Sequence, residues 1–175
     1  MNTQRLIRST VLCVAMASVT QALSAQLASG VQRAERSVAL VGGVSQFDLS
    51  GTGTTGVIGL RGELSAKRWL VLEAGLMAFR PNEQFGEQLT YVIPEVQVQV
   101  QVPSRIVRPY LGLGVGSLIA SGDRDARRAV SAAGGVRIQI PETRLDVRAE
   151  LRVRGIGESF SGAIAEWTLG SGYQF

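Results

Sequence analysis

Apolar and polar residues alternate along most of the chain from residue 36 onward. Between Val92 and Val102 one face carries five valines and Pro94, and the other carries Ile93, Glu95 and three glutamines. Between Leu145 and Arg154 every second residue is charged and those between are aliphatic. A period of two is that of a β-strand, whereas a helix would spread these charges around its whole circumference. The pattern therefore predicts strands.

Eight segments carry this alternation, and each is longer than the usual soluble strand of about 5–6 residues. They cover residues 36–48, 56–65, 69–80, 89–102, 108–120, 129–140, 144–155 and 163–175. A strand that crosses a bilayer needs about 9–11 residues. Pro94 cannot donate a ladder hydrogen bond, so we expect a bulge or a loop-end position there.

The connections between these segments differ in length in a regular way. Short turns are expected at 65–68, 103–107 and 141–143. Longer connections rich in Gly, Asp and Asn are expected at 50–55, 81–88, 121–128 and 156–161. Short turns at one end and longer loops at the other are typical of an outer-membrane barrel.

Alternation alone does not decide which face points inward, because a soluble barrel buries its apolar face and a membrane barrel exposes it to lipid. The polar face is close to charge-balanced, as a filled interior requires, since buried ions need partners. An eight-stranded bore is just wide enough to be filled by side chains. We therefore predict a lumen ion network of Arg61, Glu63, Glu73, Glu95, Arg137, Asp146, Arg148, Glu150, Arg152, Arg154 and Glu166. Gly112, Gly114 and Gly116 are expected to line the lumen and leave room for arginines.

Aromatic residues near the strand ends favour the membrane alternative, because such barrels carry aromatic girdles at both interfaces. At the short-turn end the expected girdle consists of Trp69, Tyr110, Tyr173 and Phe175. Nearer the loop end it consists of Phe47, Phe79, Tyr91 and Trp167.

Residues 1–25 have the composition of a secretory signal peptide. Arg5 and Arg8 supply the positive start, the apolar run 11–19 is too short to cross a membrane as a helix, and cleavage is expected after Ala25. Cys13, the only cysteine, lies in this leader. Residues 26–35 are expected to form a short periplasmic tail, and residues 36–175 the barrel.

Composition excludes several kinds of chemistry. The 175 residues include no histidine, which removes the most common general base and metal ligand. We expect no enzyme activity, no cofactor, no metal and no nucleic-acid partner. Asp123 and Asp125 have metal-like spacing, but the arginines beside them oppose a cation; residues 123–128 are more simply a solvated loop, with contact to lipopolysaccharide phosphates as the alternative.

The last strand carries a more specific signal. Thr168, Gly170, Tyr173 and Phe175 match the β-signal that ends bacterial outer-membrane barrels: a polar residue, a glycine, a hydrophobic residue and a final aromatic. Together with the leader and eight strands, the chain resembles small barrels of the OmpA, OmpX and OmpW type over its whole mature length. The resemblance implies Sec-dependent export, recognition by the barrel-assembly machinery, a monomer in the outer membrane, and both termini in the periplasm.

The sequence thus predicts an all-β, eight-stranded antiparallel transmembrane barrel with a polar, side-chain-filled lumen and a structural or surface-interaction role. The first alternative is a narrow channel for small or hydrophobic solutes. The second is a soluble periplasmic carrier of lipocalin type, with the apolar face inside.

Overall fold

A computed structural model describes residues 35–47, 53–80, 90–121, 126–157 and 162–175, without the side chain of Phe47. The predicted signal peptide, nearly all of the predicted tail, and Asp123 and Asp125 lie outside these residues. Among the described residues, no helix has the length and hydropathy needed to cross a membrane.

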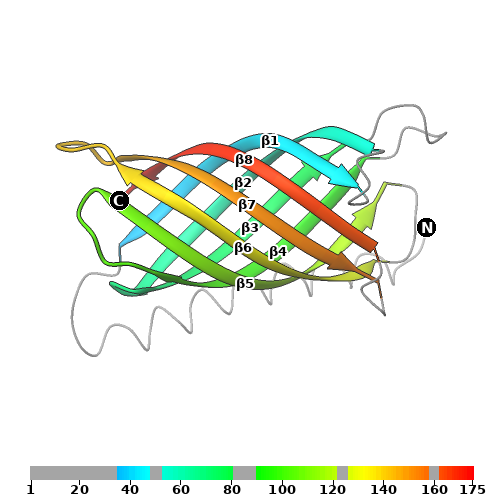
Figure 1. Ribbon diagram of the computed structural model, residues 1–175, viewed down its shortest axis with the longest axis horizontal. Coiled ribbons are helices and arrows are strands. Elements are labelled where there is room, and N and C mark those ends of the chain that lie inside the picture. Colours follow the sequence, from blue (N-terminus) through cyan, green and yellow to red (C-terminus); the bar gives the residue numbers. More distant parts are fainter. Residues whose placement is uncertain (1–34, 48–52, 81–89, 122–125, 158–161) are drawn as a thin grey trace, which may run out of the picture. The chain divides into compact units, whose positions relative to one another are not determined.

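Eight antiparallel strands form one closed barrel, which confirms the predicted fold class (Figure 1). The strands are β1 (Arg36–Phe47), β2 (Gly53–Lys67), β3 (Leu70–Phe79), β4 (Tyr91–Gln101), β5 (Val107–Ala120), β6 (Arg127–Gln139), β7 (Leu145–Ile156) and β8 (Gly162–Gln174). Each strand pairs with its neighbours in sequence, and β1 pairs with β8. Closure gives every strand two partners, so the barrel has no free sheet edge.

The seam between β1 and β8 is continuous from the pair Ser37–Gln174 to the pair Phe47–Ile164. Beyond its end, the amide of Phe175 donates to the carbonyl of Arg36 at 2.9 Å. The backbones approach closely at Gly43, where an added Cβ would lie 1.9 Å from the carbonyl oxygen of Trp167. Glycine is therefore required at this point of the seam.

Two irregularities interrupt the ladders. The register of β2 against β3 shifts between Ser65 and Lys67. Pairing of β4 with β5 is interrupted at Ile93 and Pro94 and resumes in the same register at Glu95. The bulge considered for Pro94 is therefore not formed on this side; the proline lies in the loop-end part of β4, where its missing amide interrupts the ladder locally.

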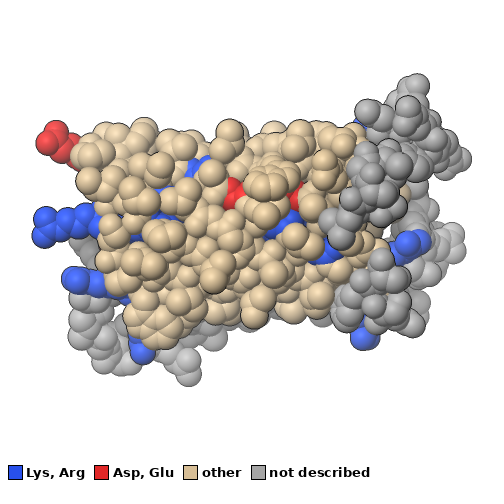
Figure 2. Space-filling model, viewed as in Figure 1, with Lys and Arg blue, Asp and Glu red and all other residues tan. Residues whose placement is uncertain are grey.

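The outer wall is apolar. Val96, Val98 and Val100 are 48%, 49% and 53% exposed, and Leu111 is 72% exposed. Figure 2 shows this face as mostly uncharged residues, with charged side chains projecting at both ends and a few charged atoms visible between uncharged ones in the middle. A soluble carrier would bury these valines, so the lipocalin alternative is wrong, whereas a membrane barrel exposes an apolar band to lipid.

The run Val38–Gly43 of β1 is apolar on both faces, and its side chains alternate between the outer wall and the interior as in the other strands. Val38 and Leu40 are exposed, whereas Ala39 and Val41 are buried. Because side chains alternate along a strand, this parity also places Arg36 on the outer face of β1.

Candidate functional site in the barrel interior

The strand period of two aims one set of polar side chains from each strand into the bore. β7 supplies the largest share, with Asp146, Arg148, Glu150, Arg152 and Arg154 at alternate positions. All five are at most 4% exposed. Ions buried to this degree must be paired with each other, because an isolated buried charge is very costly.

At the short-turn end, Glu63 is the centre of a first cluster. Its carboxylate accepts hydrogen bonds from Arg148 at 2.5 Å, from Arg137 at 2.9 Å and from the Ser37 hydroxyl at 2.8 Å. Arg148 also donates to Asp146 at 3.0 Å. One carboxylate of β2 thus connects arginines of β6 and β7 across the bore.

Arg152 is the centre of a second cluster at mid-height. Its guanidinium donates to Glu95 at 2.7 Å, and to Glu73 and Glu150 at 2.9 Å each. Arg61 lies 2.9 Å from Glu150 and 3.9 Å from Glu73. Two arginines therefore neutralise carboxylates from β3, β4 and β7.

Toward the loop end, Arg154 extends this cluster. It donates to Glu95 at 2.8 Å and pairs with Glu166 of β8. Ser131 also donates to Glu95 at 2.7 Å. The structure thus places all eleven side chains of the predicted ion network in the interior, each in an ion pair with another member of the set.

Neutral polar residues that were not in the predicted network connect its two clusters. Gln99 donates to Glu73 at 2.9 Å and accepts from Arg137. Gln97 accepts from Arg152 at 2.6 Å, and Gln101 accepts from Arg137 at 3.0 Å. Their signal was present in the sequence, since these glutamines share the alternating face of Glu95.

Tyr110 does not belong to the outer girdle, which corrects that prediction. It is 4% exposed, and its hydroxyl donates to Glu150 at 2.6 Å. The guanidinium of Arg137 lies 4.6 Å from its ring centroid, within the range of a cation–π contact. Strand parity explains the error, because position 110 shares a face with the inward Gly112.

Of the other residues predicted for the aromatic girdles, some lie on the outer wall near the strand ends and others do not. Trp69, Tyr173 and Phe175 are exposed at the short-turn end, where the rings of Tyr173 and Phe175 meet edge to face at 5.6 Å. Trp167 is exposed on the outer wall but lies near the middle of β8, away from the strand end. Phe79 is buried in the lumen, whereas a girdle residue would face the lipid.

The inward glycines of β5 have a different role from the one expected. An added Cβ would lie 2.0 Å from the Gln97 side chain at Gly112, and 2.6 Å from the Glu95 carboxylate at Gly114. These glycines therefore make room mainly for side chains of the adjacent β4, and those side chains in turn bind the arginines.

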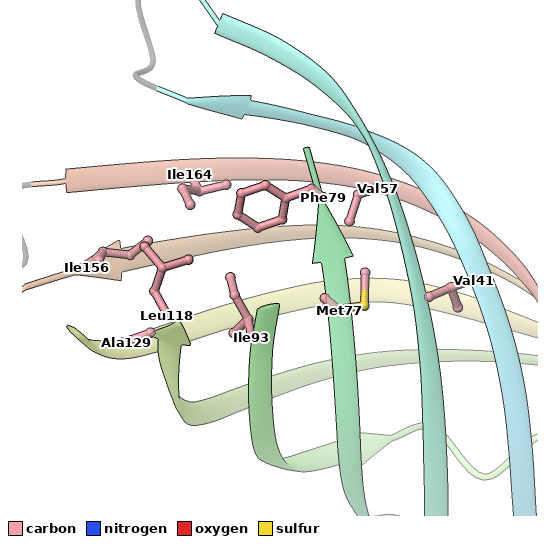
Figure 3. Packing of buried hydrophobic residues seen from close by; sticks show 9 residues of the cluster. All are labelled: Val41, Val57, Met77, Phe79, Ile93, Leu118, Ala129, Ile156 and Ile164. Carbon is pink, nitrogen blue, oxygen red and sulfur yellow. The ribbon is translucent and has the colours of Figure 1, made fainter. Parts of the chain in front are cut away.

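An apolar layer lies in the loop-end part of the bore, whereas the sequence predicted a polar lumen. Its buried members come from all eight strands: Val41, Val57, Met77, Phe79, Ile93, Leu118, Ala129, Ile156 and Ile164 (Figure 3). The partly buried Tyr91 stacks on Phe79, with ring centroids 5.4 Å apart. This layer and the ion network lie in series along the bore.

The arrangement offers little to catalysis. The carboxylates are engaged by arginines, and among the described residues no cluster of histidine, cysteine or carboxylate side chains could hold a metal ion. What the interior does is connect the eight strands through paired side chains.

An eight-stranded closed barrel with a charged interior and an apolar outer wall defines the architecture of small outer-membrane barrels. No protein-family model matches the chain, and no curated protein matches it.

Solved structures of outer-membrane barrels share the fold. The chain is similar to Neisserial surface protein A, with a TM-score of 0.66, 13% identity and coverage of 83% of this chain and 99% of that one. It is also similar to the attachment invasion locus protein Ail of Yersinia pestis, with a TM-score of 0.54, 15% identity and coverage of 82% and 100%. For the N-terminal β-barrel domain of Pseudomonas aeruginosa OprF, the TM-score is 0.51 at 14% identity, with coverage of 82% and 100%. Identities this low establish the fold alone.

Proposed function

We propose that the protein is a non-enzymatic barrel of the bacterial outer membrane, sealed by its own side chains, with a structural or surface-interaction role. The apolar outer wall supports the membrane location, because it would contact acyl chains without exposing unpaired backbone groups. Export through the predicted signal peptide and insertion guided by the predicted β-signal belong to the same proposal, as do a monomeric barrel and loop contact with lipopolysaccharide.

One observation supports the proposal that the interior is sealed. Two layers block the bore in series: the Arg152-centred ion cluster at mid-height and the apolar layer at the loop end. An ion that entered would have to displace paired buried charges and then cross an aliphatic constriction. Both steps are costly in a medium that admits little water.

Single-channel recording in planar bilayers tests this proposal. We expect the purified barrel to show no steady openings, whereas an open porin in the same bilayers provides the positive control. Regular, discrete openings of the unmodified protein would contradict the sealed interior and favour the narrow-channel alternative. If the protein shows no channels and also fails to insert, vesicle flotation identifies the failure as one of membrane location.

A further inference from the structure

Basic residues dominate the rim of the barrel at the short-turn end. The exposed and half-buried charges there are Arg36, Lys67, Arg68, Arg105, Arg108 and Arg144 against Glu35 and Glu142. The segments that connect strands at the other end carry six carboxylates in the sequence, Asp48, Glu83, Glu87, Asp123, Asp125 and Glu158, against four arginines in or directly beside them, Arg80, Arg124, Arg127 and Arg128. The two ends of the barrel therefore differ in charge.

Most of these rim cations have no acidic partner within the described residues. Arg108 pairs with Glu35 at 3.5 Å, and Lys67 lies over the Trp69 ring at 5.5 Å from its centroid. Arg36 and Arg144 form no ion pair with any described residue. They are charges available to an external anion.

Arg36 and Arg144 stand on either side of the end of β8. The carbonyl of Arg144 accepts from the amide of Gln174 at 2.8 Å, and the carbonyl of Arg36 accepts from that of Phe175 at 2.9 Å. The exposed rings of Tyr173 and Phe175 lie at the same end. Exposed aromatic residues of this kind mark the level of lipid headgroups, which places the two arginines at phosphate depth.

Above this point the outer wall has a depression of about 500 Å³. Its lining comes from the four adjacent strands β1, β8, β7 and β6, and none comes from the opposite wall, so it opens outward. Gly42, Gly134 and Ala149 form its shallow part, and the larger Trp167 and Leu169 project beside them. The inward-facing Glu150 also contributes to the lining.

The depression lies within reach of an acyl chain whose headgroup is at the rim. From Arg36 to Gly42 the tilted strand β1 rises roughly 15 Å along the barrel axis. One leaflet of the hydrocarbon core is also about 15 Å deep. A chain that starts at the phosphate level therefore extends over the depression.

We propose that this wall binds an anionic phospholipid, with the headgroup phosphate between Arg36 and Arg144 and one acyl chain in the depression. The inference rests on the proposed membrane location. Charge complementarity selects an anionic over a zwitterionic headgroup, since each arginine near a headgroup with net negative charge contributes about a fivefold gain in affinity, whereas the choline of a zwitterionic headgroup offsets its phosphate. The apolar depression selects a lipid over a free phosphate ester.

Native mass spectrometry of the folded barrel in detergent tests the headgroup. With equal amounts of dioleoyl phosphatidylglycerol and dioleoyl phosphatidylcholine, we expect the phosphatidylglycerol adduct to dominate by roughly 25-fold, the product of two fivefold gains. The double variant Arg36→Gln/Arg144→Gln should lose most of this preference. The matched variant Arg127→Gln/Arg128→Gln removes two exposed charges at the loop end and should keep it. Equal adducts in the unmodified protein, or equal losses in both variants, would overturn the site.

Two further arms test the depression. Gly42→Leu should fill it, because an added Cβ there has no atom of another residue closer than 3.7 Å, and should weaken the phosphatidylglycerol adduct severalfold. Gly56→Leu, where an added Cβ meets nothing within 4 Å, is the control. Equal adducts in both, or equally strong competition by glycerol phosphate, would overturn the acyl-chain part. Flotation with phosphatidylcholine vesicles distinguishes failure of the lipid site from failure of the proposed membrane location. A barrel that floats with the vesicles but shows no lipid preference would contradict the lipid site alone.

Discussion

The buried arginines show how a single residue stabilises this interior. Arg152 is 2% exposed and donates to three carboxylates from three strands. In water each of these ions would be solvated, so the attraction between them mainly repays the cost of burial. Removing one partner is therefore far more harmful than the net value of any pair.

We expect Arg152→Ala to lower the free energy of unfolding by about 3–5 kcal/mol, because Glu73, Glu95 and Glu150 lose a shared partner. Urea unfolding of the barrel in lipid vesicles measures the change. The control Arg127→Ala removes an exposed arginine at the start of β6 and should stay within about 0.5 kcal/mol. Similar losses in both variants would show that the network contributes nothing specific.

At the scale of the strand, the seam between β1 and β8 completes the barrel and depends on close backbone approach. Gly43 and Gly170 both face atoms of the partner strand that an added Cβ would meet at under 3 Å. Most of these atoms belong to backbone, which cannot move without breaking the ladder. The seam is also the last pairing in sequence, since it joins the two ends of the described barrel.

We expect Gly43→Ala to reduce the yield of closed barrel on refolding and to lower its stability by a few kcal/mol, the usual range for overpacking. Gly56→Ala, on the same sheet but open to the outside, should be neutral or slightly stabilising, because alanine has less backbone freedom to lose on folding. Both variants are scored by the fraction of folded band on an unheated gel. Equal yields would show that the seam tolerates a methyl group.

At the scale of the whole molecule, the barrel has inverted polarity. Its large exposed hydrophobic residues lie on all eight strands, whereas the ions of the network lie in the interior and the exposed ions lie near the barrel ends. Such a surface would cause aggregation in water, whereas it is suited to contact with lipid. Closure of the sheet also gives the backbone amides and carbonyls internal hydrogen-bond partners, which a lipid environment requires.

The whole barrel should unfold as one unit. We expect unheated protein in mild detergent to migrate faster on a gel than boiled protein, because every strand is held on both sides and none can detach alone. Carbonate washing should leave it in the membrane fraction. A single mobility before and after boiling, or release by carbonate, would contradict the membrane barrel.

Much of the architecture could be predicted from the sequence, because the alternation of side chains between the two faces of a strand is a local property. The period of two located eight strands, and the structure begins and ends them within a few residues of the predicted bounds. The same parity placed the predicted ions of each strand together on one face, without deciding which face is inward. Tyr110 and Phe79 were misplaced because they were assigned by their position along the strand instead of by their face.

Other features depended on contacts between strands that are distant in sequence. Which carboxylate meets which arginine depends on the stagger of strands around the barrel, as in the contact of Glu63 with Arg148, 85 residues away. The apolar layer could not be predicted either, since each strand contributes only one or two residues to it.

The sequence by itself determined the number of strands, their alternating faces and the balance of charge, because these follow from local geometry and composition. Only the tertiary structure decided that the valines face outward, that the bore holds an ion network and an apolar layer, and that the small outward residues of β1, β6 and β7 form one depression. The physical reason is closure: a strand has two equivalent faces until the sheet curls, and curling makes one face the interior of the barrel and the other its surface.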